Sequence, residues 1–261
     1  MAVRELFVVA YRLLKANKIY NTPVFSHIYA GNPIIGTAFA VDKQSFKSDG
    51  KSVNMGSDNH IQGKQTCYFI TFTTVDWVDV FIRPVYKQVI VHTLNHFIDN
   101  KGLTVYGWCL MTNHLYLLAQ AREGYTMGEI EKEFKSFTAT KILEAIDTEP
   151  EARKEWMLKR FENFGNILGL MKKFHVWQNS GMPHFVDMRK TDALIEHFFY
   201  IHENPVRDRF VDAAADYPYS SARDYAGMKG SVKITKLTTV EQLLAASESF
   251  NSNFFVKYIR N

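Results

Sequence analysis

Residues 102–120 read GLTVYGWCLMTNHLYLLAQ, and this stretch decides the fold. It is rich in β-branched and aromatic residues and is interrupted by glycine and asparagine, which is typical of two buried antiparallel strands rather than of a helix. The strands are predicted to meet at residues 111–113. Because residues two positions apart in a strand point to the same face of the sheet, His114 and Tyr116 would lie side by side, with the leucine after each of them on the other face.

This pair of polar side chains has two explanations. Side by side on a rigid, buried strand, they form a candidate site. Alternatively, the histidine and the tyrosine are packing residues on a sheet face that is partly exposed to solvent. Since both residue types are intermediate in burial, such a pair taken alone is more often structural. The rest of the chain has to distinguish the two explanations.

Composition limits the class of protein. With 261 residues, 46% of them hydrophobic, the chain can bury the core of one domain, with or without appendages. A net charge of +4 suits a protein that touches nucleic acid in one groove, although many enzymes share it. The two cysteines lie in apolar runs, which excludes a disulfide framework and a zinc ribbon and makes the cytoplasm the expected location. The apolar run near the start is too short to span a membrane, so no membrane partner is expected.

The chain is predicted to divide into three regions. Residues 1–61 are expected to be a poorly ordered N-terminal extension, because residues 42–64 are rich in polar and turn-forming residues. The extension is either genuine or the product of a start codon assigned upstream of Met55. Residues 62–230 form the predicted domain, and residues 231–261 form a polar C-terminal tail.

The domain is predicted to be α+β, with an antiparallel sheet and helices packed on it. A strand over residues 66–75 is followed by a helix that starts at Pro84, and then by the paired strands of residues 102–120. Further helices are expected over residues 127–146, 151–164 and 193–202, the last of them capped by Thr191-Asp192 and stopped by Asn204-Pro205.

The helix over residues 193–202 carries a second group of polar residues. Glu196, Tyr200 and, at the end of the helix, Asn204 are spaced four apart on one face, so the Tyr200 phenol and the Asn204 amide can converge on one point. On the helix alone, a single tyrosine near the end is far more often a core or rim residue than a nucleophile.

Several basic and aromatic residues are candidates for contact with DNA. The segment that contains Lys172, Lys173 and Trp177 either lies along a phosphate backbone with bases stacked on its rings, or is a strand that fills the core. Lys135 belongs to a helix face where acidic residues alternate with basic ones, so its charge alone does not define a nucleic-acid surface. Arg223, in an aromatic and polar loop, is a candidate phosphate contact.

A set of short motifs, taken in chain order, resembles the REP-associated tyrosine transposases, a branch of the single-tyrosine HUH transposases, and particularly their relatives in the Bacteroidetes. The motifs lie within residues 62–230 and are YFITFT at 68–73 with Asp76-Trp77, GWCLMTNHLYLL at 107–118, FKSFT at 134–138, VWQ at 176–178, YIHENPV at 200–206 and YPYSSARDY at 217–225. Each is weak alone, and the ordered set is specific.

The resemblance implies a fold and a chemistry. The fold is a small antiparallel sheet with helices packed on it, close to a ferredoxin-like α+β core. A histidine-hydrophobe-histidine motif on a central strand binds a divalent metal, Mg²⁺ or Mn²⁺, which polarises the scissile phosphate of single-stranded DNA. A tyrosine from a later helix attacks that phosphate and forms a 5′-phosphotyrosine link, which conserves the bond energy for rejoining. The implied partner is single-stranded or hairpin DNA in the transposition of a mobile element, and a homodimer is compatible with this role.

Carried over to this chain, the resemblance makes His114 the first metal ligand, Tyr200 the nucleophile and Asn204 a third, polar ligand. Tyr116 stands where the family has its second histidine. A neutral phenol is a poor ligand, and its deprotonation is costly at neutral pH unless the metal lowers a pKa of about 10.

Three functions therefore stay open. The chain is a metal-dependent transposase that cleaves and rejoins DNA through Tyr200, a degenerate or domesticated module that binds hairpin DNA without cutting it, or a protein with no nucleic-acid partner in which His114 and Tyr200 are core residues. The loss of one ligand favours reduced or lost cleavage on a fold that still binds DNA.

Overall fold

The computed structural model describes residues 66–167, 174–178, 184–188, 191–238 and 240. Residues 1–61, Lys172, Lys173 and most of the predicted C-terminal tail lie outside these described residues. None of the helices in the described part has the length and apolarity needed to cross a membrane.

The sheet has four antiparallel strands in the spatial order β2-β3-β1-β4. The strands are β1 (Thr66–Thr73), β2 (Leu103–Leu110), β3 (His114–Ala121) and β4 (His184–Asp187). Helix α3 (Pro84–Asn100) joins β1 to β2, and α4 (Met127–Thr148) and α5 (Lys154–Ile167) come between β3 and β4. The strand order and connections are those of a ferredoxin-like split β-α-β arrangement, which confirms the predicted fold class.

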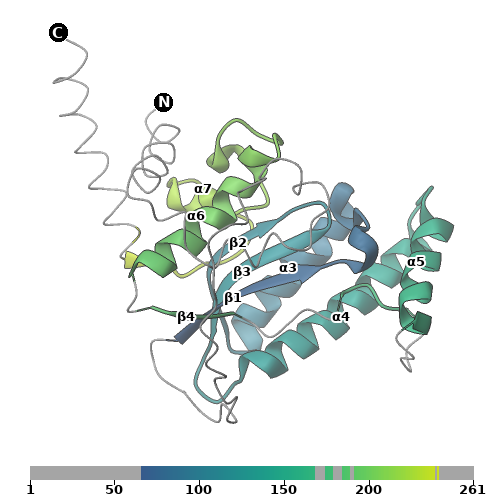
Figure 1. The fold of residues 1–261 in the computed structure, drawn as a ribbon, viewed down its shortest axis with the longest axis horizontal. Coiled ribbons are helices and arrows are strands. Elements are labelled where there is room, and N and C mark those ends of the chain that lie inside the picture. The colour runs from purple at the N-terminus through teal and green to yellow at the C-terminus, as the bar shows by residue number, and fades with distance from the viewer. Residues whose placement is uncertain (1–65, 168–173, 179–183, 189–190, 239, 241–261) are drawn as a thin grey trace, which may run out of the picture.

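Further helices follow or interrupt this arrangement. They are α6 (Thr191–Arg207), the single turn α7 (Ala222–Tyr225) and three 3-10 turns, η2 (Val75–Trp77), η3 (Val80–Ile82) and η4 (Ala214–Asp216). Figure 1 shows α3 and α4 on one face of the sheet and α6 with α7 on the other.

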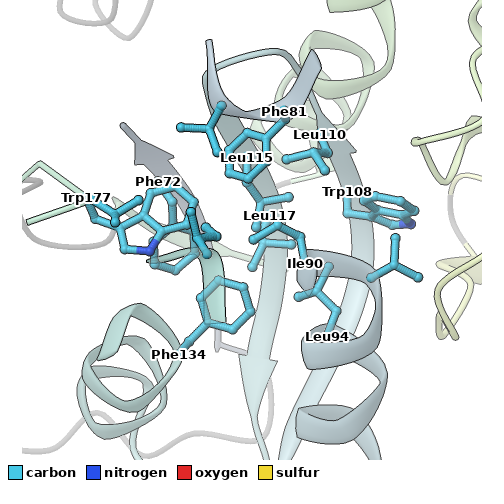
Figure 2. Close-up of a cluster of buried hydrophobic side chains, with 14 of the residues drawn as sticks. Phe72, Phe81, Ile90, Leu94, Trp108, Leu110, Leu115, Leu117, Phe134 and Trp177 are labelled. Carbon is cyan, nitrogen blue, oxygen red and sulfur yellow. The ribbon is translucent and has the colours of Figure 1, made fainter. Parts of the chain in front are cut away.

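Alternation along the strands creates two cores, one on each face of the sheet. Leu115 and Leu117 on β3 point to the α3 and α4 side, where Figure 2 shows them with the buried rings of Phe72, Phe134 and Trp108. Tyr116 and Leu118 point the other way and pack with residues of α6. The predicted alternation of residues 114–117 is therefore confirmed.

Helix α6 runs about one turn further than predicted. The prediction that Asn204-Pro205 stops it was wrong, because the helix continues to Arg207 with Pro205 inside it. Proline removes one backbone donor, but the turn is held because the N–H of Asp208 donates to the carbonyl of Asn204 at 2.9 Å. The extra turn brings Arg207 onto the face that carries Tyr200.

Trp177 belongs to the core between the sheet and α4. Its backbone bridges Thr74, its ring stacks on Phe81 with the ring centres 5.7 Å apart, and its Nε1–H donates to the Thr138 hydroxyl at 2.9 Å. The side chain is buried. The structure thus supports the core interpretation of this tryptophan over base stacking.

Replacing Thr138 by valine is expected to lower the free energy of unfolding by about 1–3 kcal/mol, because the buried Trp177 N–H loses its acceptor while the side-chain shape is kept. Urea unfolding followed by circular dichroism measures this. Thr140→Val is the matched control, since Thr140 is exposed on the same helix and is expected to change the free energy by less than about 0.5 kcal/mol. Equal effects in the two variants would contradict the role given to the Trp177 hydrogen bond.

Candidate functional site

The site lies where α6 crosses the face of β3 that carries His114 and Tyr116. The hydroxyl oxygens of Tyr116 and Tyr200 are 3.2 Å apart, and their ring centres are 5.4 Å apart. The rings of His114 and Tyr116 meet edge to face at 4.6 Å. The structure therefore brings together the three side chains that sequence motifs far apart in the chain singled out.

The last turns of α6 hold Tyr200 in place. The side chain of Asn204 is buried at 1% exposure, and its Nδ2 donates to the carbonyl of Tyr200 at 2.6 Å. The guanidinium of Arg207 donates to Asn204 Oδ1 and lies 5.2 Å from the centre of the Tyr200 ring. These residues are three, four and seven positions apart, so they share one face of the helix. We use "candidate site" for His114, Tyr116, Tyr200, Asn204 and Arg207.

The turn before β3 fixes the orientation of His114. The Nδ2 group of Asn113 donates to the carbonyl of Trp77 at 3.2 Å and to the carboxylate of Asp79 at 3.1 Å, which leaves its Oδ1 as an acceptor. His114 Nδ1 lies 2.7 Å from this Oδ1 and so carries the ring proton in this network. The other nitrogen, Nε2, is buried without a hydrogen-bond partner in the structure.

Burial sets the protonation states at the site. It lowers the pKa of His114 to about 4, and the positive charge of Arg207 acts in the same direction. Burial also raises the pKa of Tyr116 well above its usual value, and the neighbouring Tyr200 adds to this. At neutral pH the imidazole is therefore neutral and the Tyr116 phenol keeps its proton.

These residues do not fit a divalent metal ion. His114 Nε2 is a suitable donor, but the Tyr116 phenol stays protonated and the Asn204 amide oxygen already accepts a hydrogen bond from a cation, Arg207. Among the residues with described side chains, no three or more histidine, cysteine, aspartate or glutamate side chains cluster as a metal site would require. Arg207 is the positive charge that the candidate site does contain.

Arg207 and Glu203 are the residues of this region that sequence reasoning missed. Burial raises the pKa of Glu203 to about 7, with Arg207 opposing the shift, so this carboxyl changes charge near neutral pH. Both residues continue the face of Tyr200 at helical spacing, three and seven positions after it. Arg207 was missed because the helix was predicted to stop at Asn204-Pro205, and Glu203 was missed because its burial is not visible in the sequence.

The predicted DNA contacts are scattered. Lys135 lies over the ring of Phe72 at 5.5 Å and pairs with Glu131 at 2.7 Å, and Phe72 belongs to the core on the other side of the sheet from Tyr200. Arg223 lies on α7, on the same side as α6, and its Nη1 donates to the carbonyl of Ala215 at 3.4 Å. Neither is part of the candidate site.

The motif of residues 217–225 attaches the C-terminal segment to the edge strand β2. The Tyr217 hydroxyl donates to the carbonyl of Leu110 at 2.8 Å, and the Tyr225 hydroxyl donates to the carbonyl of Tyr106 at 2.9 Å. Ser221 joins this contact to α6, because its Oγ lies 2.7 Å from Nε2 of His202. The motif covers a strand edge that would otherwise be open, which is a structural role.

Acidification is expected to destabilise the fold through His202. Burial lowers the pKa of His202 from 6.5 to about 3, so between these values the unfolded chain binds more protons than the folded one. The contribution of the neutral, buried His202 to the free energy of unfolding is complete above pH 6.5 and is lost progressively as the pH falls toward 3. Urea unfolding at stepped pH measures the slope. His202→Gln should flatten it and the exposed His92→Gln should not, and an unchanged slope in His202→Gln would rule this explanation out.

No protein-family model matches this sequence, and no curated protein matches it. Among solved structures, the chain is similar to one described as a REP-associated tyrosine transposase bound to a REP hairpin, with 18% sequence identity and a TM-score of 0.44. The match covers 71% of this chain and 96% of that chain.

Proposed function

We propose that the protein binds single-stranded or hairpin DNA at the candidate site, with Arg207 and Tyr200 facing a backbone phosphate, and that strand cleavage is lost or strongly reduced. The observation that carries this proposal is the 3.2 Å contact between the hydroxyls of Tyr116 and Tyr200. At the position of the second metal-binding imidazole in the family that the chain resembles, this chain has Tyr116, whose hydroxyl contacts Tyr200, the residue that the resemblance makes the nucleophile.

The chemistry of phosphodiester cleavage explains why binding is favoured over cutting. A tyrosine that attacks phosphorus must lose its proton, and the charge on the non-bridging oxygens must be neutralised. Because its pKa is raised, Tyr116 keeps its own proton at neutral pH and is not available as a phenolate to accept that of Tyr200. Arg207 can pair with a phosphate, since a guanidinium matches phosphate geometry, but one partly exposed arginine neutralises less charge than a metal ion would.

Slow cleavage is the second candidate, and one observation favours it. His114 Nε2 is a buried acceptor without a hydrogen-bond partner in the structure, beside the tyrosine pair. In this case His114 accepts the phenol proton as the Tyr200 oxygen bonds to phosphorus, and the bond from phosphorus to the 3′ oxygen breaks, with that oxygen taking up a proton. The step is slow because a histidine whose pKa is lowered to about 4 is a weak base.

Binding and denaturing-gel assays with a hairpin oligonucleotide that carries a single-stranded flank test the proposal. We expect the full chain and Tyr200→Phe to bind with similar, salt-sensitive affinity, because Tyr200→Phe keeps the ring beside Arg207. We expect no covalent adduct with either protein. Runs with EDTA and with Mn²⁺ check the role of metal.

The possible outcomes separate the candidates. An adduct that resists denaturant and is absent in Tyr200→Phe would establish the cleaving enzyme instead. An absence of binding even at low salt would rule out both candidates and leave the protein without a nucleic-acid role.

A further inference from the structure

An exposed row of aromatic and basic side chains starts at the candidate site. The ring of Trp77 meets the ring of His114 edge to face at 6.3 Å, and Trp77 is 43% exposed. The neighbouring Asp76 pairs with Arg160 at 3.5 Å, and the Arg160 guanidinium lies 5.8 Å from the centre of the Trp156 ring. Trp156, on α5, is 47% exposed. We use "aromatic row" for Trp77, Arg160 and Trp156.

The backbone holds Trp77 outward. Asp76 and Trp77 adopt φ angles of 50° and 54°, the left-handed region that a bulky side chain rarely occupies. The turn is fixed by the Thr74 hydroxyl, which donates to the carbonyl of Val78 at 2.8 Å, and by Asn113, which donates to the carbonyl of Trp77. The same asparagine orients His114, so the outward tryptophan and the site histidine share one support.

The other tryptophans of the chain behave differently. Trp108 and Trp177 are buried in the core between the sheet and the helices α3 and α4. The two exposed indoles are thus the two in the aromatic row. Trp77 lies beside His114 of the candidate site, and Trp156 lies beside Arg160. Backbone strain at a residue that stays 43% exposed points to a role in binding rather than in stability.

We propose that the aromatic row binds the bases of a single DNA strand whose backbone phosphate is held at Tyr200 and Arg207. This inference rests on the proposed function and identifies the surface that binds the DNA strand next to the candidate site. Every nucleobase has a π-face, so exposed indole rings bind single strands with little sequence preference. Arg160 can exchange Asp76 for a phosphate, because an exposed ion pair of this kind contributes little.

Intrinsic fluorescence tests the inference directly. Since Trp108 and Trp177 are buried, quenching by an oligo(dT) strand reports on Trp77 and Trp156. We expect quenching on titration, and an affinity lowered about fivefold in Trp77→Ala and in Trp156→Ala, the lower end of the loss per stacked base. Trp77→Phe should keep most of the affinity and lose much of the quenching. Arg160→Gln should reduce the salt dependence by about one ion.

Phe137→Ala is the matched control. Phe137 is also 43% exposed, but it lies on α4 against His96 of α3, on the other side of the sheet from Tyr200. Its removal should leave the DNA affinity within about twofold. Circular dichroism of each variant establishes that the fold is kept.

The results separate this inference from the proposed function. If the wild-type chain binds DNA and Trp77→Ala and Trp156→Ala bind equally well, the aromatic row is wrong and the proposed function stands. If the wild-type chain does not bind, both fail. If the tryptophan variants break up a dimer seen by sedimentation and leave the DNA affinity unchanged, the row is an interface between copies of the chain and the inference is overturned.

Discussion

Substituting Tyr116→His is expected to raise the affinity of the protein for Mn²⁺ at least about tenfold. Residues 114 and 116 share one face of β3, so the change places two imidazoles next to each other where the native chain has an imidazole and a protonated phenol. Changes in the groups around metal ligands alone alter affinity by about 10–100-fold, and gaining a ligand is a larger change than that.

The same substitution is expected to produce a covalent adduct between Tyr200 and a hairpin oligonucleotide in the presence of Mn²⁺. Removing the Tyr116 hydroxyl also frees the Tyr200 hydroxyl from its 3.2 Å contact. Tyr116→Phe separates the two effects, because it removes the hydroxyl without adding a ligand and should leave the Mn²⁺ affinity unchanged. Calorimetric titration with Mn²⁺ and a denaturing gel provide the two measurements.

An unchanged Mn²⁺ affinity in a folded Tyr116→His variant would contradict the idea that the missing ligand is the defect. Arg207 would then exclude the ion, because it is positively charged and its guanidinium already donates to the Asn204 amide oxygen. The double variant with Arg207→Ala, which removes both the charge and the donor to Asn204 Oδ1, would bind Mn²⁺ in that case.

The fold was predictable where the signal is local. The alternation of residues 114–117 and the glycine and asparagine that interrupt the run indicated which side chains face which side of the sheet, and the structure confirms this. Periodicity within one element does not say which face of a sheet a helix covers. That α6 lies over the His114 face followed from the resemblance and not from the residue pattern.

The roles of three residues could not be predicted from the sequence, for physical reasons. For Trp177 the sequence left base stacking and core filling both open, because composition does not encode burial and its partner Thr138 is 39 positions away. Arg207 was missed because Pro205 normally ends a helix. The outward position of Trp77 could not be predicted, because its left-handed backbone depends on a hydrogen bond from Asn113, a residue on a different turn.

Substituting Arg207→Gln is expected to lower the affinity for hairpin DNA about 10- to 30-fold. Hydrogen bonds to charged groups contribute about 1.5–3 kcal/mol, and the lower end applies because the Arg207 side chain is 41% exposed. Glutamine keeps a donor for Asn204 Oδ1 but removes the charge, so α6 should stay in place. Fluorescence anisotropy at several salt concentrations should show the weaker binding together with a smaller salt dependence.

Two controls make this result specific to the candidate site. Arg209→Gln removes a charge two positions further on, from an exposed residue past the end of α6, and should weaken binding about threefold or less. Arg207→Lys should recover part of the affinity, because a lysine keeps the charge and loses the paired donors that match a phosphate. If Arg207→Gln and Arg209→Gln weaken binding equally, the charge acts as part of a general basic surface. If Arg207→Gln weakens binding more than Arg209→Gln does, and Arg207→Lys restores only part of the affinity, a phosphate must be held at one place. That place is beside the Tyr200 ring, over which the Arg207 guanidinium lies.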